Sequence, residues 1–240
     1  MRRWLPFVLV ALAGCGADAD APEPVAAPAF TPAKVAAPAP EPAGRYPIAR
    51  LTRPAMLRTR PGGRMVGRVR TRTEFGSSTR LSVVGRREGW LEVVSPQRPN
   101  GRSAWIPADA ASLSATDYAI HVDRSARRIT LRRGARVLRR MTVAVGRAGN
   151  ATPTGRFAVT DRLRTGRPDS PYGCCIVALT GHQTRLVPGW AGGDRLAIHT
   201  TPQRETIGTA ASLGCLRGGR ADVEFLLRRV PLGTPVFIRA

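Results

Sequence analysis

Apolar and polar residues alternate along much of the second half of the chain. The stretch YAIHVDRSARRITLRRGARVLRRMTVAVG, residues 118–146, contains three such runs separated by Asp-Arg-Ser and Arg-Gly. A period of two places one face of a strand in a core and the other in water, so three antiparallel strands are expected. Further runs predict strands at GRFAVTDRL, CCIVALTG, DRLAIHTT and TPVFIRA, residues 155–163, 174–181, 194–201 and 234–240.

One segment in this half has the spacing of a helix instead. In RADVEFLLRRV, residues 220–230, Val223, Leu226 and Leu227 fall on one face. Asp222 stands near the start, where a carboxylate favours the positive end of the helix dipole. Residues 117–240 are therefore predicted to form one mainly β domain with a single short helix, long enough to enclose its own core.

Residues 45–113 contain shorter apolar runs divided by Pro-Gly-Gly, Gly and Pro-Asn-Gly. This spacing is typical of a small all-β unit. The pattern GWLEVV…GRSAWIP, residues 89–107, resembles the closing strands of a bacterial SH3-like domain, a small β-barrel. That resemblance implies binding of peptidoglycan or of a protein partner. The alternative is a spacer in which Trp90 and Trp105 are simply core residues.

The chain begins MRRWLPFVLVALAGC, in which two arginines precede an apolar run of ten residues. The run is too short to span a bilayer as a helix and fits an export signal. Leu12 to Cys15 resembles the lipobox of bacterial lipoproteins, which implies a signal peptide at 1–14 and lipidation of Cys15. The alternative is an ordinary secretory signal with a chance cysteine. Residues 15–44 then form an Ala/Pro-rich linker, and the protein is expected in the cell envelope, extracytoplasmic and lipid-anchored to a membrane.

The formal charge of +22 comes almost wholly from arginine, because Lys34 is the sole lysine. The arginines are spread through residues 45–240 without interleaved aromatic residues, so nucleic-acid binding is not expected. Anionic wall polymers and lipids are the expected polyanions. The sequence also lacks metal-ligand spacing and a phosphate-binding loop, so neither a metal nor a cofactor is expected.

Lipidation of Cys15 would leave three cysteines, Cys174, Cys175 and Cys215, and an odd number leaves one thiol free. A bridge between the neighbours Cys174 and Cys175 is expected to be strained. Consecutive Cα atoms lie about 3.8 Å apart, whereas disulfides prefer about 4.4–6.8 Å. A bridge from either of them to Cys215 is the alternative that would disable a nucleophile at position 215.

His199 and Cys215 lie within AIHTTPQRETIGTAASLGCLRG, residues 197–218. Thiolate is the nucleophilic form of cysteine, and a nearby imidazole helps to generate it. His199 ends an apolar strand that can hold its ring rigidly. The Ser-Leu-Gly-Cys turn can direct the N–H groups of Gly214 and Cys215 towards a developing oxyanion.

Three segments in this half resemble the YkuD-type L,D-transpeptidase family. They are TPTGRF (152–157), the His199 to Arg217 segment containing SLGCLR, and PLGTPVFI (231–238). The resemblance covers residues 117–240 and implies a β-sandwich catalytic domain acting on peptidoglycan stem peptides. Cys215 would form a thioester with a tetrapeptide donor and His199 would act as base. An amine acceptor would then complete a cross-link between third stem residues.

The resemblance also implies roles for neighbouring residues. The main-chain carbonyl of Thr200 would orient the histidine, Arg217 would hold a substrate carboxylate, Ser212 would shape the loop and Tyr172 would line the cleft. One departure stands out, because Leu213 occupies the position of the family's motif histidine and cannot form a hydrogen bond through its side chain. A catalytically impaired peptidoglycan-binding lipoprotein and an L,D-carboxypeptidase using water therefore remain alternatives.

Overall fold

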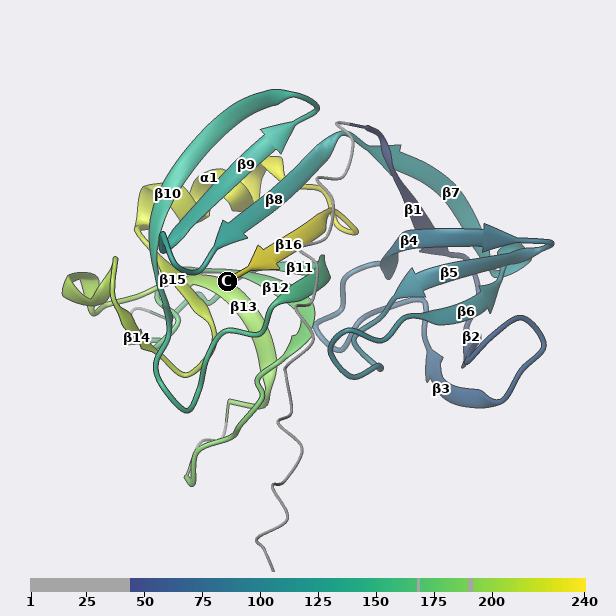
Figure 1. Ribbon diagram of the computed structural model, residues 1–240, viewed down its shortest axis with the longest axis horizontal. Helices are drawn as coiled ribbons and strands as arrows, with labels where there is room; N and C mark the ends of the chain where they lie inside the picture. The colour runs from purple at the N-terminus through teal and green to yellow at the C-terminus, as the bar shows by residue number, and fades with distance from the viewer. Residues whose placement is uncertain (1–43, 168, 190–191) are drawn as a thin grey trace, which may run out of the picture. The chain divides into compact units, whose positions relative to one another are not determined.

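The computed structural model describes residues 44–167, 169–189 and 192–240. The predictions of a signal peptide, of Cys15 lipidation and of most of the linker lie outside these residues. Within the described ranges the chain is mainly β and forms two sheets (Figure 1). The fold class expected from the alternating runs is confirmed. Each sheet encloses its own cluster of buried apolar side chains.

The smaller sheet is built by the first strands of the described chain. In spatial order it reads β3-β2-β6-β5-β4-β1-β7. Its strands are β1 (Tyr46–Leu51), β2 (Ala55–Arg58), β3 (Met65–Val69), β4 (Arg80–Arg87), β5 (Trp90–Val94), β6 (Ala104–Pro107) and β7 (Ala111–Thr116). Strand β7 pairs with β1 along its whole length and so continues past residue 113, where the sequence pattern placed the end of this unit. The SH3-like assignment itself stays a prediction.

Trp90 and Trp105 are half-buried, and they share one face of the β5–β6 pair. The opposite face carries the fully buried Leu91 and Ile106, which stand directly across from each other. Alternation along the strands therefore assigns the aliphatic residues, and not the two tryptophans, to the core. Two partly exposed indoles on one face leave this sheet with an apolar surface besides its core.

The larger sheet has the order β14-β10-β15-β13-β12-β11-β16-β8-β9. Its strands are β8 (Tyr118–Asp123), β9 (Arg128–Arg133), β10 (Arg136–Gly146), β11 (Gly155–Arg164), β12 (Cys175–His182), β13 (Arg195–Thr200), β14 (Ala210–Ser212), β15 (Leu216–Gly218) and β16 (Pro235–Arg239). Strand β9 also pairs with β10, so the sheet closes upon itself (Figure 1). The three strands predicted over 118–146 are β8, β9 and β10, and they are antiparallel as expected.

Helix α1 (Arg220–Arg229) forms where the 3.6-residue period predicted it. Val223, Leu226 and Leu227 are buried, and α1 packs against β12 and β13. Burying each such side chain contributes roughly 1.5–3 kcal/mol. The helix thus supports the two strands that lead into the histidine site. Across the described ranges, helices fall short of the length and apolarity needed to cross a bilayer.

Candidate active site

His199 is the fifth residue of β13 and is buried. Its Nδ1 lies 2.6 Å from the main-chain carbonyl oxygen of Thr200. A carbonyl only accepts, so Nδ1 carries the proton and Nε2 is the basic nitrogen of the neutral ring. Burial lowers the pKa of His199 to about 4, against hydrogen bonds to the backbone of Thr200 and Tyr172. The ring is therefore a neutral base in the resting protein.

Cys215 comes directly before β15, which runs parallel to β13. Ile198 stands opposite Leu216 and His199 opposite Arg217, so the same register puts Cys215 level with Ala197. His199 and Arg217 are paired and so share one face. Tyr172 connects the histidine to the cysteine, because its ring stands edge-on to His199 and its pKa is raised by burial and by the charge of Cys215. The pairing of β13 with β15 thus brings the histidine and the cysteine, 16 positions apart in the sequence, into the same region of the domain.

Among the described cysteines, Cys215 is the one that stays a free thiol. Its Sγ lies 3.8 Å from the carbonyl oxygen of Arg195 and 3.8 Å from Nε2 of Gln183. Burial raises the pKa of Cys215 to about 11, although the Ala197 backbone, Arg217 and Gln183 act in the opposite direction. Cys215 therefore rests as a neutral thiol and His199 as a neutral imidazole, and not as thiolate and imidazolium.

The turn before Cys215 is held by hydroxyl groups. Ser212 donates through Oγ to the carbonyl of Cys215 over 2.5 Å and accepts from the N–H of Gly214 over 3.1 Å. Thr152 donates to the carbonyl of Gly214 over 2.8 Å and accepts from the N–H of Gly146 over 2.9 Å. Gly214 has φ +125°, which a residue with a side chain rarely adopts. The N–H of Gly214, expected to face an oxyanion, is bonded to Ser212 here.

Three other residues singled out in the sequence surround this pair. The ring of Tyr172 stands edge-on to His199, with centroids 5.0 Å apart. The hydroxyl of Thr200 donates to the carbonyl of Tyr172 over 2.9 Å. Arg217 is half-buried, and its guanidinium donates to Oε1 of Gln203 over 3.1 Å. Tyr172 and Thr200 hold the histidine, whereas Arg217 lies at the edge of the site.

A family model of the L,D-transpeptidase catalytic domain, YkuD, matches residues 117–238. The chain belongs to the YkuD family. Its match begins one residue before β8 and ends one residue before the end of β16, so it covers the larger sheet, helix α1 and the His199–Cys215 pair.

Curated relatives agree with this family. The chain is 34% identical over 121 residues to the Bacillus subtilis protein YkuD, whose name gives it provisionally as an L,D-transpeptidase. That alignment covers 50% of this chain and 65% of the relative. YqjB of the same organism, named in the same way, is 30% identical over 107 residues, which are 40% of this chain and 57% of YqjB. The chain thus spans less than two thirds of either relative.

Solved structures of similar proteins include an L,D-transpeptidase from Mycobacterium smegmatis, with 20% identity and a TM-score of 0.40. That comparison covers 57% of this chain and 73% of the other. L,D-transpeptidase 3 from Mycobacterium tuberculosis gives 19% identity and a TM-score of 0.42, with 57% and 74% covered.

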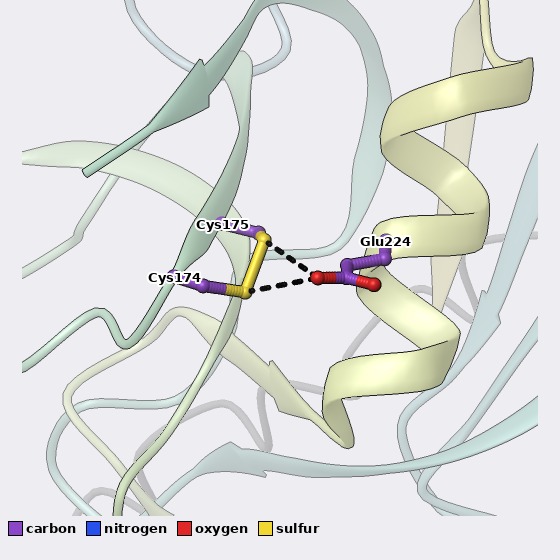
Figure 2. Close-up of side chains that lie close together, drawn as sticks. All are labelled: Cys174, Cys175 and Glu224. Atoms are coloured by element: carbon purple, nitrogen blue, oxygen red, sulfur yellow. Dashed lines mark hydrogen bonds between the residues drawn. A yellow bond between two sulfur atoms is a disulfide. The ribbon is translucent and has the colours of Figure 1, made fainter. Parts of the chain in front are cut away.

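The YkuD domain also contains a disulfide that the sequence argument disfavoured. Cys174 and Cys175 are bridged across a Cα separation of 3.8 Å, the separation that led us to expect strain in such a bridge. Gly173, with φ +60°, turns the chain immediately before the pair. Both sulfur atoms lie on the same side, 3.8 and 3.9 Å from Oε1 of Glu224 on α1 (Figure 2). The bridge leaves Cys215 unpaired, so the alternative that would have disabled it does not occur.

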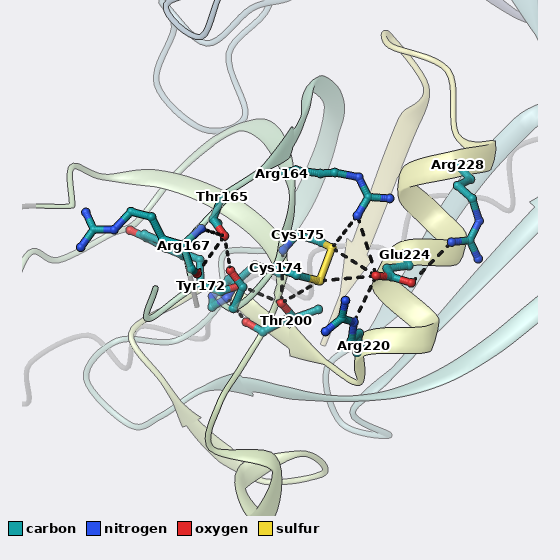
Figure 3. Close-up of a disulfide and its surroundings, with 12 residues drawn as sticks. Arg164, Thr165, Arg167, Tyr172, Cys174, Cys175, Thr200, Arg220, Glu224 and Arg228 are labelled. Atoms are coloured by element: carbon teal, nitrogen blue, oxygen red, sulfur yellow. Dashed lines mark hydrogen bonds and ion pairs between the residues drawn. A yellow bond between two sulfur atoms is a disulfide. The ribbon is translucent and has the colours of Figure 1, made fainter. Parts of the chain in front are cut away.

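This disulfide lies between two polar groups (Figure 3). On one side, the N–H of Cys175 donates to the hydroxyl of Thr200 over 3.3 Å. On the other side, Glu224 forms ion pairs with Arg220 at 3.2 Å, Arg228 at 3.5 Å and Arg164 at 3.8 Å. Cys174, Cys175 and Glu224 are close enough to share a metal ion. Bridged sulfurs carry no thiolate, however, and the carboxylate is already surrounded by arginines, so this state does not suit a cation.

Two residues of the site were missed by sequence reasoning. Thr152 was noted only as part of the TPTGRF segment, yet its hydroxyl fixes the turn before Cys215. Gln183, which contacts Cys215, is 32 positions away from it and carries no local sequence signal. Both act through contacts that exist only once the larger sheet has formed.

Proposed function

We propose that this protein is a peptidoglycan L,D-transpeptidase, a cysteine-dependent acyltransferase with Cys215 as nucleophile and His199 as base. The observation that carries the proposal is the free Cys215 thiol directly before β15, which pairs with the strand that carries His199, within a domain of the YkuD family. Peptidoglycan stem peptides are its proposed partners, with a tetrapeptide as donor and an amine as acceptor.

In the first half-reaction the sulfur of Cys215 attacks the carbonyl carbon between the third stem residue and the terminal D-alanine. Because the pKa of Cys215 is about 11 and that of His199 about 4, proton transfer accompanies the attack. The C–S bond forms as Nε2 of His199 takes the thiol proton. The ring then gives that proton to the departing amine as the C–N bond breaks. D-alanine leaves and a thioester remains on Cys215.

In the second half-reaction an amine of a neighbouring stem attacks the thioester. His199 removes a proton from this amine, the C–S bond breaks, and the proton returns to the sulfur. The product is a cross-link between two third residues. Thr200 supports both steps, because its carbonyl holds Nδ1 and so keeps Nε2 as the basic nitrogen. Arg217 is proposed to bind a substrate carboxylate with its forked donors.

The experiment is the intact mass of the protein after mixing with a tetrapeptide-stem muropeptide, beside a Cys215→Ala variant. An adduct equal to the donor minus D-alanine, absent from Cys215→Ala, is the expected result. Conversion of that adduct to a cross-linked product identifies an amine acceptor, and release of free tripeptide identifies the L,D-carboxypeptidase. A folded protein that forms no adduct and releases no D-alanine would contradict the proposal and favour a peptidoglycan-binding lipoprotein in which Leu213 marks a lost activity.

We also propose that the protein works in the cell envelope, outside the cytoplasm, tethered to a membrane through lipidated Cys15. The support is the sequence around Cys15 together with the YkuD family of the folded part. The basic surface suits the same place, since wall polymers and lipid headgroups are anionic. The Ala/Pro-rich linker would let the YkuD domain reach stem peptides away from the anchor.

A further inference from the structure

The turn that carries Cys215 has little hydrogen-bonding capacity left for the nucleophile. The side chain of Leu213 has no donor, the N–H of Gly214 is bonded to Ser212, and the carbonyl of Gly214 is bonded to Thr152. A thiolate forming in this buried position needs a donor from elsewhere, because an unpaired buried charge is costly. The side-chain donor that the structure brings to the sulfur is Gln183, through its Nε2 at 3.8 Å.

Gln183 follows the last residue of β12 and is half-buried. Its side chain also packs along the turn, since a Cβ built on Gly214 would lie 3.4 Å from Cγ of Gln183. Gln183 therefore contacts this turn at two points, the Gly214 backbone and the sulfur of Cys215. The stem of the glutamine covers the Gly214 backbone while its amide reaches the sulfur.

The backbone around Gln183 is fixed by contacts from several elements. Its own N–H donates to the carbonyl of Asp194 over 2.6 Å. The side chain of Asn100 forms two hydrogen bonds with the backbone of the preceding residue, His182. Its Oδ1 accepts from the N–H of His182 over 2.9 Å, and its Nδ2 donates to the carbonyl of His182 over 2.7 Å. The His182 ring contacts the carbonyl of Pro96 through Nε2 at 2.7 Å and the Asp194 carboxylate through Nδ1 at 2.9 Å. These bonds fix the backbone from which the Gln183 side chain reaches Cys215 before any substrate arrives, as preorganised catalysis requires.

We propose that Gln183 is a further catalytic residue, whose amide N–H donates to the sulfur of Cys215 as the thiolate character of that sulfur grows. The inference rests on the proposed acyl transfer. During acylation the thiol proton goes to His199 while the amide hydrogen bond stays on the sulfur. During deacylation the same bond stabilises the sulfur as leaving group. A bond to a charged acceptor is about twice as strong as a neutral one, so it favours the reacting state over the resting thiol.

Two variants of the full-length protein separate this role from packing. Gln183→Met keeps an unbranched side chain of similar length and removes the donor. Gln183→Glu keeps the shape and replaces the donor with a carboxylate that only accepts when ionised. Thr184→Val, at the exposed neighbouring position, is the matched control. The first readout is the pH dependence of iodoacetamide alkylation, measured by mass spectrometry on the peptide that contains Cys215. The second is the rate of adduct formation with the tetrapeptide donor.

The expected order is wild type and Thr184→Val first, then Gln183→Met, then Gln183→Glu. In Gln183→Met, adduct formation should slow by about 10- to 100-fold, the loss typical of a hydrogen bond to a charged group. The midpoint of alkylation should move to higher pH in the same order. Unchanged alkylation and adduct formation in a folded Gln183→Met protein would overturn the inference. If wild type forms no adduct, the proposed function fails, while the alkylation series still decides whether Gln183 stabilises the thiolate.

Discussion

Replacing Thr152 with valine tests whether the turn before Cys215 depends on a single hydroxyl. The substitution keeps the shape of the side chain and removes the partner of two backbone groups, the part-buried N–H of Gly146 and the buried carbonyl of Gly214. Leaving one buried polar group unsatisfied costs about 1–3 kcal/mol. With partial relaxation of the turn, Thr152→Val should therefore lower the free energy of unfolding by about 2–4 kcal/mol.

The matched control is Thr152→Ser, which keeps the hydroxyl and removes one methyl group, at about 1 kcal/mol. Urea unfolding monitored by tryptophan fluorescence measures both variants. For a chain of this size each kcal/mol corresponds to a Tm shift of roughly 2–4 °C, so Thr152→Val should melt about 5–15 °C below wild type. The displaced turn should also slow adduct formation at Cys215. If Thr152→Val is as stable and as reactive as Thr152→Ser, the reasoning from this hydroxyl is refuted.

Three further predictions follow from the site and its surroundings. The pKa of His199 is about 4 in the folded protein, against an ordinary value of 6.5. Between these two pH values the unfolded state binds more protons than the folded state. The free energy of unfolding should therefore rise with pH across this range, by on the order of 3 kcal/mol. Urea titrations at pH 4.5 and pH 7 should show this gain in wild type and a smaller one in His199→Gln. Gly173→Ala should destabilise the protein by more than about 2 kcal/mol, because the backbone has positive φ and the new Cβ would lie 2.2 Å from the hydroxyl of Thr200. Gly166→Ala, at similar φ in open space, should cost only about 1 kcal/mol, and equal melting temperatures for the two would contradict the steric argument. Cys15→Ser should move the protein from the membrane fraction to the soluble fraction of a cell extract, as measured by immunoblotting of the two fractions. Retention of Cys15→Ser in the membrane fraction would rule out Cys15 as the anchor.

The strands that could be predicted from sequence are those whose own residues alternate. Strands β8 and β9 contain such runs, β12 and β13 are short apolar runs buried along most of their length, and α1 has the helical period, so the local pattern of each agrees with its environment. Strands β14 (Ala210–Ser212) and β15 (Leu216–Gly218) were missed because three residues carry no period. Their extended form depends on pairing with β10 and β13, which are distant in sequence.

The candidate site likewise has residues that the sequence could predict and residues that it could not. His199 and Cys215 were found because one segment contains both residues and because that segment resembles the YkuD family. The Cα separation of Cys174 and Cys175 is 3.8 Å as expected, but the sequence did not decide which of the cysteines are bridged. The contact of Gln183 with Cys215 depends on β12 and β13 lying side by side, and no local pattern carries that information.

The place of β16 in the larger sheet affects how the protein is made. This strand is the last of those described in chain order, yet it lies between β11 and β8 and pairs with both. Until β16 has emerged from the ribosome, the hairpin of β8 and β9 lacks its neighbour on that side, and the sheet cannot be completed. Sequential folding during synthesis therefore leaves this domain unfinished until β16 has been made. For the export proposed above this delay would be an advantage, because the polypeptide would still be unfolded during translocation and the proposed nucleophile would be assembled only beyond the membrane.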